Sequence, residues 1–137
     1  MRQGYSADDL DELLNQKSGL KGISGVSRDF REIEAAIEED SPRAELARDL
    51  YLHRLKAFLG SMLMSLGGID AIVFTGGIGE HAAGIRAAAC QSMDFLEVKL
   101  DVEKNAQSPE DCEVATDESA VRVLEIHTQE DWAITQD

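Results

Sequence analysis

The chain has 137 residues, and its 13 Lys and Arg stand against 27 Asp and Glu, which gives a formal net charge of −14. Such a balance argues against a nucleic-acid binder, which needs a basic patch, and against docking on anionic lipid. Hydrophobic residues make up 43% of the sequence, an ordinary globular share, so we expect a single folded domain over residues 1–137.

The sequence also bears on where the protein works. No apolar run approaches the roughly 18–20 residues of a membrane span, and no charged-then-apolar leader opens the chain. The two cysteines, Cys90 and Cys112, are too few for a disulfide framework. Because cytosolic proteins rarely keep disulfides, we expect two free thiols and a cytoplasmic protein without membrane or nucleic-acid partners.

The first part of the chain predicts two short helices with a loop between them. The first helix lies within residues 1–16, where Ser6 and Asp9 have the spacing of a capping box. Residues 17–28 carry three glycines and three serines, which is loop composition. Asp29 is expected to cap the next helix, over about 30–39, whose apolar residues recur at helical spacing.

A long helix is expected over about 42–66. Ser41 and Pro42 have the residue types of an N-cap and a first helical position, and Gly67–Gly68 ends the segment. Apolar residues fill one broad face and spread beyond it, so we expect burial on more than one side.

The second half of the chain alternates strands and helices. Residues 69–75 form a nearly continuous apolar run, which predicts a strand covered on both faces. A glycine turn follows, and then a helix over about 80–93. Residues 95–100 alternate as a strand, and 101–113 are polar and predict a loop.

A strand over about 121–126 and a short helix from about 128–130 onward complete the predicted elements. Strands separated by helices favour an α/β fold with a small parallel or mixed sheet flanked by helices. The strands are too few to cover the apolar faces of the helices, so the pattern resembles a part of something larger.

The glycine turn Gly76-Gly77-Ile78-Gly79 is the strongest local signal for a binding site. Glycines let the backbone approach a ligand, and a helix N-terminus beyond a strand favours anions. The spacing matches neither G-x-G-x-x-G nor a P-loop, so a strand-to-helix turn without a ligand remains the alternative.

Four segments, in the same order, resemble the acetate kinase family. Residues 70–81 (DAIVFTGGIGEH) resemble its adenosine-contacting segment, and 17–34 (KSGLKGISGVSRDFREIE) resemble its segment ending in Asp-Phe-Arg. Residues 85–105 and 121–131 resemble two later stretches. The resemblance implies the C-terminal lobe of an actin-like, sugar-kinase-type (ribonuclease H-like) fold, and phosphoryl transfer between ATP and acetate with Mg²⁺.

The resemblance implies a nucleotide role for Asp29, Phe30 and Arg31, which match the family's Asp-Phe-Arg. A guanidinium stacks well on a purine, and a carboxylate accepts hydrogen bonds from a base or a ribose. The simpler alternative is that Asp29 only caps a helix and Arg31 is solvated surface.

The family's adenosine loop corresponds to Gly77, Ile78, Gly79, Glu80 and His81. His81 stands where the family usually has Asn. Both side chains donate and accept hydrogen bonds, so the contact is compatible with either residue, and capping of a helix start is the alternative for His81.

Glu130 matches the family's magnesium-linked glutamate, and a carboxylate is a suitable ligand for Mg²⁺ on nucleotide phosphates. Gln129 replaces the family's Asn and His127 its Pro. The alternative for Glu130 is a glutamate in the first turn of a helix, which the helix dipole favours.

The family's catalytic arginines, histidines and aspartate, and its phosphate loop, lie upstream of the matched segments. We therefore expect the chain to be the ATP- or ADP-binding C-terminal part of an acetate kinase, inactive by itself. We also expect it to self-associate or to bind the missing N-terminal lobe. A stand-alone nucleotide-binding module and a non-catalytic structural or interaction protein are the alternatives, and acetate, propionate and butyrate stay open as substrates.

Overall fold

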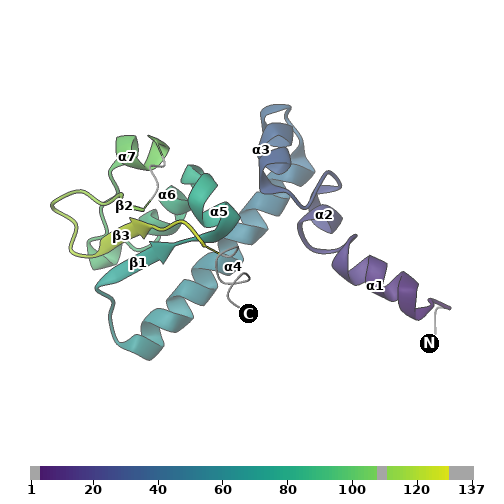
Figure 1. The fold of residues 1–137 in the computed structure, drawn as a ribbon, viewed down its shortest axis with the longest axis horizontal. Coiled ribbons are helices and arrows are strands. Elements are labelled where there is room, and N and C mark those ends of the chain that lie inside the picture. The colour runs from purple at the N-terminus through teal and green to yellow at the C-terminus, as the bar shows by residue number, and fades with distance from the viewer. Residues whose placement is uncertain (1–3, 108–110, 130–137) are drawn as a thin grey trace. The chain divides into compact units, whose positions relative to one another are not determined.

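The structure, a computed structural model, describes residues 4–107 and 111–129. It divides the chain into two compact units, Met1–Arg54 and Leu55–Asp137. Over the described residues, no helix is long and apolar enough to cross a membrane. In chain order (Figure 1), the elements are α1 (Ala7–Asn15), α2 (Gly19–Ser24), α3 (Phe30–Glu38), α4 (Pro42–Leu66), β1 (Ala71–Phe74), α5 (Gly76–His81), α6 (Ala83–Gln91), the short 3₁₀ helix η1 (Asp94–Leu96), α7 (Val102–Gln107), β2 (Cys112–Glu113) and β3 (Arg122–Glu125).

Capping residues begin the helices of the first unit as the sequence predicts. Ser6 caps α1, and its side chain and that of Asp9 form a complete capping box. The Asp29 side chain accepts a hydrogen bond from the amide of Arg31 and so begins α3. Asp40, with φ of 60°, separates α3 from α4.

The predicted loop over residues 17–28 is wrong, because α2 lies inside it. Gly25 takes the left-handed conformation, with φ of 72°, and its N–H closes α2 on the carbonyl of Lys21. The guanidinium of Arg43 donates to the carbonyls of Gly22 and Ile23 at 2.9 Å each. A contact from 20 residues further along therefore stabilises a helix that local composition disfavours.

The first unit has a small core between α3 and the beginning of α4. Phe30 and Ile33 are buried on α3, and Ala44 and Ala47 are buried on α4. The ring of Phe30 lies 5.5 Å, centroid to centroid, from that of Tyr51. Residues spaced by three or four on each helix thus form the contact, as their periodicity predicts.

Helix α4 has the predicted bounds but not the predicted burial. The N–H of Gly67 bonds to the carbonyl of Leu63, and Gly67 has φ of 73°, which ends the helix. Only Ala44 and Ala47 are buried along it, so the expectation of burial on more than one side is wrong for this chain. Several large side chains are exposed, namely Leu46, Leu50, Phe58, Met62, Met64 and Leu66.

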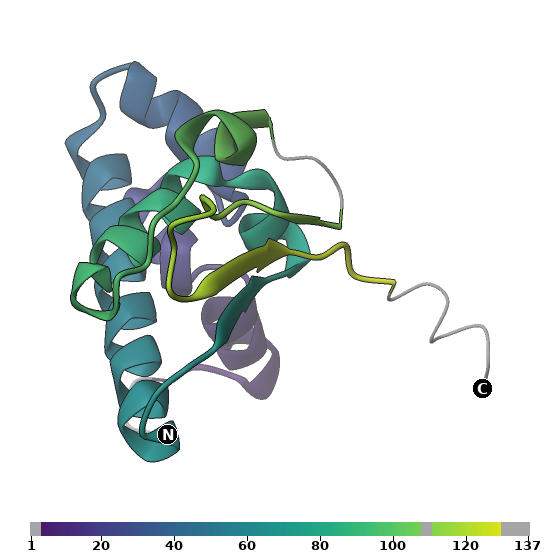
Figure 2. The same ribbon diagram turned by 90° about the vertical axis from the view of Figure 1, so that its left-hand side faces the viewer.

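The second unit contains a mixed sheet in the order β1-β3-β2 (Figure 2). β1 is parallel to β3, and β2 is antiparallel to β3. The register pairs Ile72 with Val123 and Phe74 with Glu125, and these four side chains are buried on the inner face. The small mixed sheet of the predicted α/β fold is confirmed.

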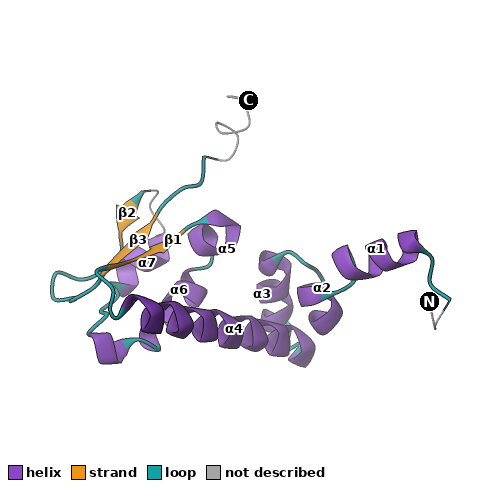
Figure 3. Ribbon diagram, turned by 90° about the horizontal axis from the view of Figure 1, so that it is seen from below, coloured by secondary structure: helices purple, strands orange, loops and turns teal. Residues whose placement is uncertain are grey.

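One face of this sheet is open among the described residues. Val73 lies on the outer face of β1 and is 52% exposed, so the prediction of a strand covered on both faces is wrong. The inner face packs on α6 through Ala89 and Cys90, and on the last part of α4 through Leu55 and Leu59. Figure 3 shows both helices on that one side of the strands.

The helix after the glycine turn begins earlier than predicted and is interrupted. The glycines form the first turn of α5 instead of a separate turn, and the chain leaves helical geometry at Ala82 before α6 begins. Because glycine has no Cβ, the backbone can pass directly from the end of β1 into the first turn of α5.

The region between α6 and β3 is also different from the prediction. Residues 95–100 form η1 and an irregular stretch in which only Leu100 bridges to Ala115. The predicted loop over 101–113 contains α7 and β2. The strand predicted at 121–126 is confirmed as β3, and the last predicted helix lies mainly outside the described residues.

Matched substitutions on the two faces of the sheet test the one-sided burial. Val123 is fully buried and Val73 is half exposed. Val123→Ala should lower the free energy of unfolding by roughly 2–3 kcal/mol, from lost burial and a cavity. Val73→Ala should cost less than about 1 kcal/mol, the span of strand propensity. Urea unfolding measures both, and equal losses would mean that the outer face is covered in solution.

Candidate functional site

The glycine turn has one glycine that the chain's own geometry does not require. Gly76 has φ of 72°, which favours glycine. A Cβ on Gly79 would lie 3.2 Å from the carbonyl carbon of Phe74, so glycine is needed there for close packing. A Cβ on Gly77 would meet nothing within 4 Å, and Gly77 is exposed. Open space therefore lies beside the backbone of Gly77.

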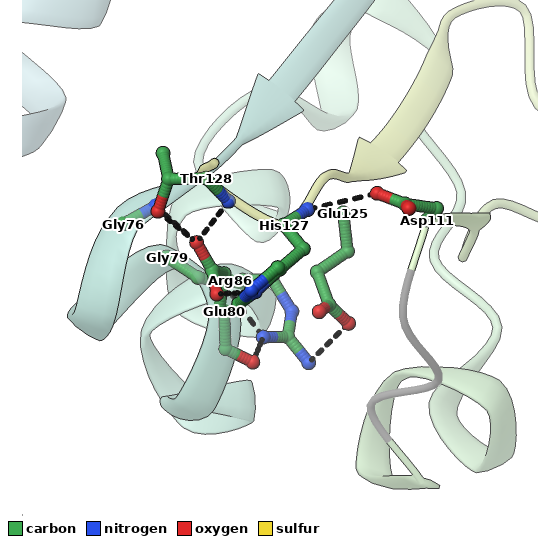
Figure 4. Close-up of polar contacts among 8 residues, drawn as sticks. All are labelled: Gly76, Gly79, Glu80, Arg86, Asp111, Glu125, His127 and Thr128. Carbon is green, nitrogen blue, oxygen red and sulfur yellow. Dashed lines mark hydrogen bonds and ion pairs between the residues drawn. The ribbon is translucent and has the colours of Figure 1, made fainter. Parts of the chain in front are cut away.

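Glu80 joins this turn to the segment that follows β3 (Figure 4). Its Oε1 accepts hydrogen bonds from the amide of Gly76 at 2.8 Å and from Thr128, at 3.0 Å from N and 2.8 Å from Oγ1. Its Oε2 lies 2.8 Å from Nδ1 of His127. Both carboxylate oxygens are thus used by protein groups.

The contacts of Glu80 keep it ionised although the residue is only 4% exposed. The hydrogen bonds from Thr128 lower the pKa of Glu80 to about 2, and those from His127 and Gly76 act in the same direction. Burial opposes this shift, and the donors outweigh it.

Arg86, on α6, is a fully buried cation that faces the same region. Its Nη1 donates to the carbonyls of Gly79 and Glu80 at 2.7 Å each. Nε and Nη2 donate to the side chain and the carbonyl of Asn105, at 2.7 and 2.8 Å. Arg86 therefore fixes the last turn of α5 against α7.

The charge of Arg86 is balanced by Glu125 on β3. The Nη2–Oε2 distance is 3.9 Å, and Glu125 is 2% exposed. Oε2 accepts no hydrogen bond from the described residues, so this pair is held by charge alone at that oxygen. Strand β3 is thereby linked to the turn through a buried ion pair.

The predicted nucleotide residues of the first unit lie together around the start of α3. Arg31 Nη2 lies 2.7 Å from Asp29 Oδ2, and the Arg31 hydrogen bonds lower the pKa of Asp29 to about 2. The Arg31 side chain is 80% exposed. Phe30 is buried in the unit's core. The capping contact of Asp29 is present, and the exposed Arg31 guanidinium lies beside it.

The predicted residues of the second unit differ in their exposure. Gly77 and His81 are exposed, and Ile78 and Gly79 are partly buried beside them. Glu80 is buried, with the contacts given above. Glu130, the predicted magnesium ligand, lies outside the described residues, and the described part of the chain holds no cluster of three metal-ligating side chains.

Sequence reasoning missed Arg86, Asn105 and Thr128. Arg86 stands among alanines on α6, and Glu125 interrupts an apolar strand, so each polar residue at an apolar position was a signal. The partners of Arg86 are Asn105 and Glu125, which lie 19 and 39 positions after it in the sequence, and no local pattern reveals such pairs. The two cysteines are free as predicted, and burial raises the pKa of Cys90 to about 11.

The model of the acetokinase family matches residues 1–136. The chain belongs to this family. It is 66% identical over 136 residues to the acetate kinase of Acaryochloris marina and 61% identical over 132 residues to that of Nostoc punctiforme, covering 99% and 96% of this chain. The acetokinase resemblance of the four sequence segments is thereby confirmed.

Solved structures of the family have the same fold over this region. The Porphyromonas gingivalis acetate kinase matches 99% of the chain with a TM-score of 0.86 and 38% identity, and a Francisella tularensis propionate kinase matches 97% with a TM-score of 0.81 and 34% identity. The chain spans about a third of the length of these relatives: 34% of the Acaryochloris protein and 34% of each of the two structures.

Loss of the buried guanidinium should be far more harmful than loss of a surface one. Arg86→Met leaves the Glu125 carboxylate and three carbonyl acceptors without their cationic partner. The free energy of unfolding should therefore fall by about 3 kcal/mol or more. Arg122→Met, which removes an exposed pair with Glu113, should cost less than about 1 kcal/mol.

Urea unfolding measures both variants. If Arg86→Met does not fold, the double variant with Glu125→Leu serves instead, because it also removes the stranded charge. Equal costs for Arg86→Met and Arg122→Met would contradict a structural role for the buried cation.

Proposed function

We propose that this chain is the nucleotide-binding C-terminal part of an acetate kinase, which transfers a phosphoryl group between ATP and acetate. The observation that carries the proposal is the open space beside Gly77, at the carboxyl end of β1, in a chain that belongs to the acetokinase family. Open α/β sheets bind ligands at that end of their strands, and glycine allows a close approach of the backbone.

In this proposal, the loop from Gly77 through Ile78, Gly79 and Glu80 to His81 contacts the adenosine. The exposed backbone of Gly77 and the exposed imidazole of His81 are available for that contact. In the first unit, taken by itself, the exposed guanidinium of Arg31 is available to the base or ribose of a nucleotide, and Asp29 orients it through their 2.7 Å contact. Phe30 anchors both from the core.

For Mg²⁺ on the nucleotide phosphates, we propose a single carboxylate of this region as a ligand. Glu80 is saturated by hydrogen bonds, and Asp111 Oδ1 accepts from the amide of His127 at 2.9 Å. Glu130 follows Thr128 by two residues and is the proposed ligand, directly or through water. One protein carboxylate is sufficient, because Mg²⁺ in such sites takes most of its ligands from phosphates and water. When bound, the ion neutralises phosphate charge.

The proposed fold assignment is the C-terminal lobe of an actin-like, ribonuclease H-like kinase, with residues 1–137 as its single nucleotide-binding domain. The parallel pairing of β1 with β3 and the helical crossover between them support it. The free thiols of Cys90 and Cys112 support a cytoplasmic location.

We infer further that the chain alone does not make acetyl phosphate. Phosphoryl transfer needs cations around the equatorial oxygens. The two arginines of the second unit are both engaged by protein groups, Arg86 by carbonyls and Arg122 by Glu113 on the outer face, which supports this inference. The edge and outer face of β1, which the described residues leave open, support association with the remaining part of an acetate kinase, or with a second copy.

Nucleotide binding is tested by Gly77→Ala. The new methyl meets no protein atom, so the free energy of unfolding should change by less than about 1 kcal/mol. The methyl should occupy the space in which we propose that the nucleotide binds, and so weaken Mg·ADP binding by about tenfold or more. Isothermal titration calorimetry measures the affinity.

Gly60→Ala is the matched control, since a Cβ there also meets nothing and lies outside the site. Equal Mg·ADP affinities for Gly77→Ala and Gly60→Ala would move the binding site away from this turn. A folded chain that gives no binding heat would favour an interaction role over nucleotide binding.

A coupled assay tests the activity. The purified chain should stay at the background of a heat-killed sample. Addition of the other two-thirds of the Acaryochloris marina acetate kinase, expressed separately, should raise formation of acetyl phosphate above that background. Turnover by the chain alone would show that its own residues suffice for catalysis.

A further inference from the structure

Glu80 contacts two segments, one four residues away in the sequence and the other 48 residues away. One is the amide of Gly76, where the glycine turn begins, and the other is Thr128, beyond the end of β3. The parallel ladder of β1 and β3 ends two residues before each of these segments, at the hydrogen bond from the Ile126 amide to the Phe74 carbonyl. The carboxylate is therefore a cross-link between the start of α5 and the chain that leaves the sheet.

The segment after β3 is held at successive residues. The amide of Ile126 donates to the carbonyl of Phe74 at 2.9 Å and extends the parallel ladder. The amide of His127 donates to Asp111. Thr128 gives both its amide and its hydroxyl to Glu80 Oε1. Glu80 is thus the acceptor for the residue two positions before Glu130.

One end of this cross-link lies beside the proposed nucleotide turn, and the other precedes the proposed Mg²⁺ ligand in the sequence. The amide of Gly76 precedes the open backbone of Gly77, and Thr128 precedes Gln129 and Glu130. We propose that Glu80 is a positioning residue, which ties the glycine turn to the segment after β3 so that the proposed adenosine contact at Gly77 keeps one geometry relative to Thr128. This inference rests on the proposed function and gives Glu80 a specific role within it.

The contacts distinguish positioning from direct ligation. Both oxygens of Glu80 already have protein donors, and the residue is 4% exposed. A nucleotide would have to displace Thr128 or His127 to reach the carboxylate. Arg86 Nη1 donates to the backbone carbonyl of Glu80 at 2.7 Å, so the backbone that carries the Glu80 side chain is held in place.

The first test is amide hydrogen exchange, read by NMR at each end of the cross-link. Glu80→Gln presents one carbonyl oxygen and an NH₂ to a cluster of donors, so protection at Gly76 and Thr128 should fall together by about tenfold or more. Thr128→Val keeps its own amide and should still lower protection at Gly76. The amide of Cys90, in α6, should be unchanged in both variants.

The second test is Mg·ADP affinity by calorimetry, at a temperature where all variants are folded. Glu80→Gln and Thr128→Val should each weaken binding by about fivefold or more, and the double variant should be no weaker than the worse single variant. Exposed Glu118→Gln, in the same unit, is the matched control and should bind as the parent chain does.

The outcomes separate this inference from the proposed function. If the parent chain binds nucleotide and Glu80→Gln binds equally well, Glu80 has only a structural role and the inference is overturned. If protection at the two ends changes independently, it is overturned whatever the affinity. If the two ends respond together but the parent chain binds no nucleotide, the cross-link stands and the proposed function fails.

Discussion

The second unit depends on one buried positive charge. A guanidinium taken out of water loses several kcal/mol of solvation, and only a dense set of acceptors offsets that loss. Arg86 has such a set: the carbonyls at the end of α5, both oxygens of Asn105, and the carboxylate of Glu125. The elements that supply these acceptors are therefore fixed relative to one another by the need to solvate one side chain.

This arrangement separates two tasks around the glycine turn. Arg86 binds backbone carbonyls and sets where α5 lies, while Glu80 binds backbone and side-chain donors and sets where the chain leaves the sheet. Arg86 contacts carbonyls near the end of α5, and Glu80 contacts the amide at its beginning. Neither set of contacts involves the exposed backbone of Gly77, which is therefore accessible to a ligand.

The sequence predicts well those features that depend on neighbouring residues. The capping box of Ser6, the cap at Asp29, the end of α4 at Gly67 and the apolar strand β3 all follow from local chemistry. It fails where a distant partner decides. Arg43 stabilises a helix in a glycine- and serine-rich stretch. Where the sequence predicts a strand over residues 95–100, only a bridge from Leu100 to Ala115 is present.

The same division applies to the site. The glycine turn is visible as a local pattern, but the partners of Glu80 and Arg86 come from elsewhere in the chain, and a single sequence does not pair them. Resemblance to a family located the turn and gave Glu80 a general place in a loop. Only the three-dimensional contacts show that its carboxylate faces Thr128 and His127.

The open face of the sheet has a consequence for handling the protein. Val73 and Leu124 lie there beside the ion pair of Arg122 with Glu113, which breaks up the apolar surface with charge. The charged pair interrupts the apolar face, but β1 itself has no charged side chain from Ala71 to Phe74, so its edge can still pair with a further strand. The net charge of −14 adds repulsion between copies. High salt screens that repulsion, so the chain should precipitate more readily as ionic strength rises.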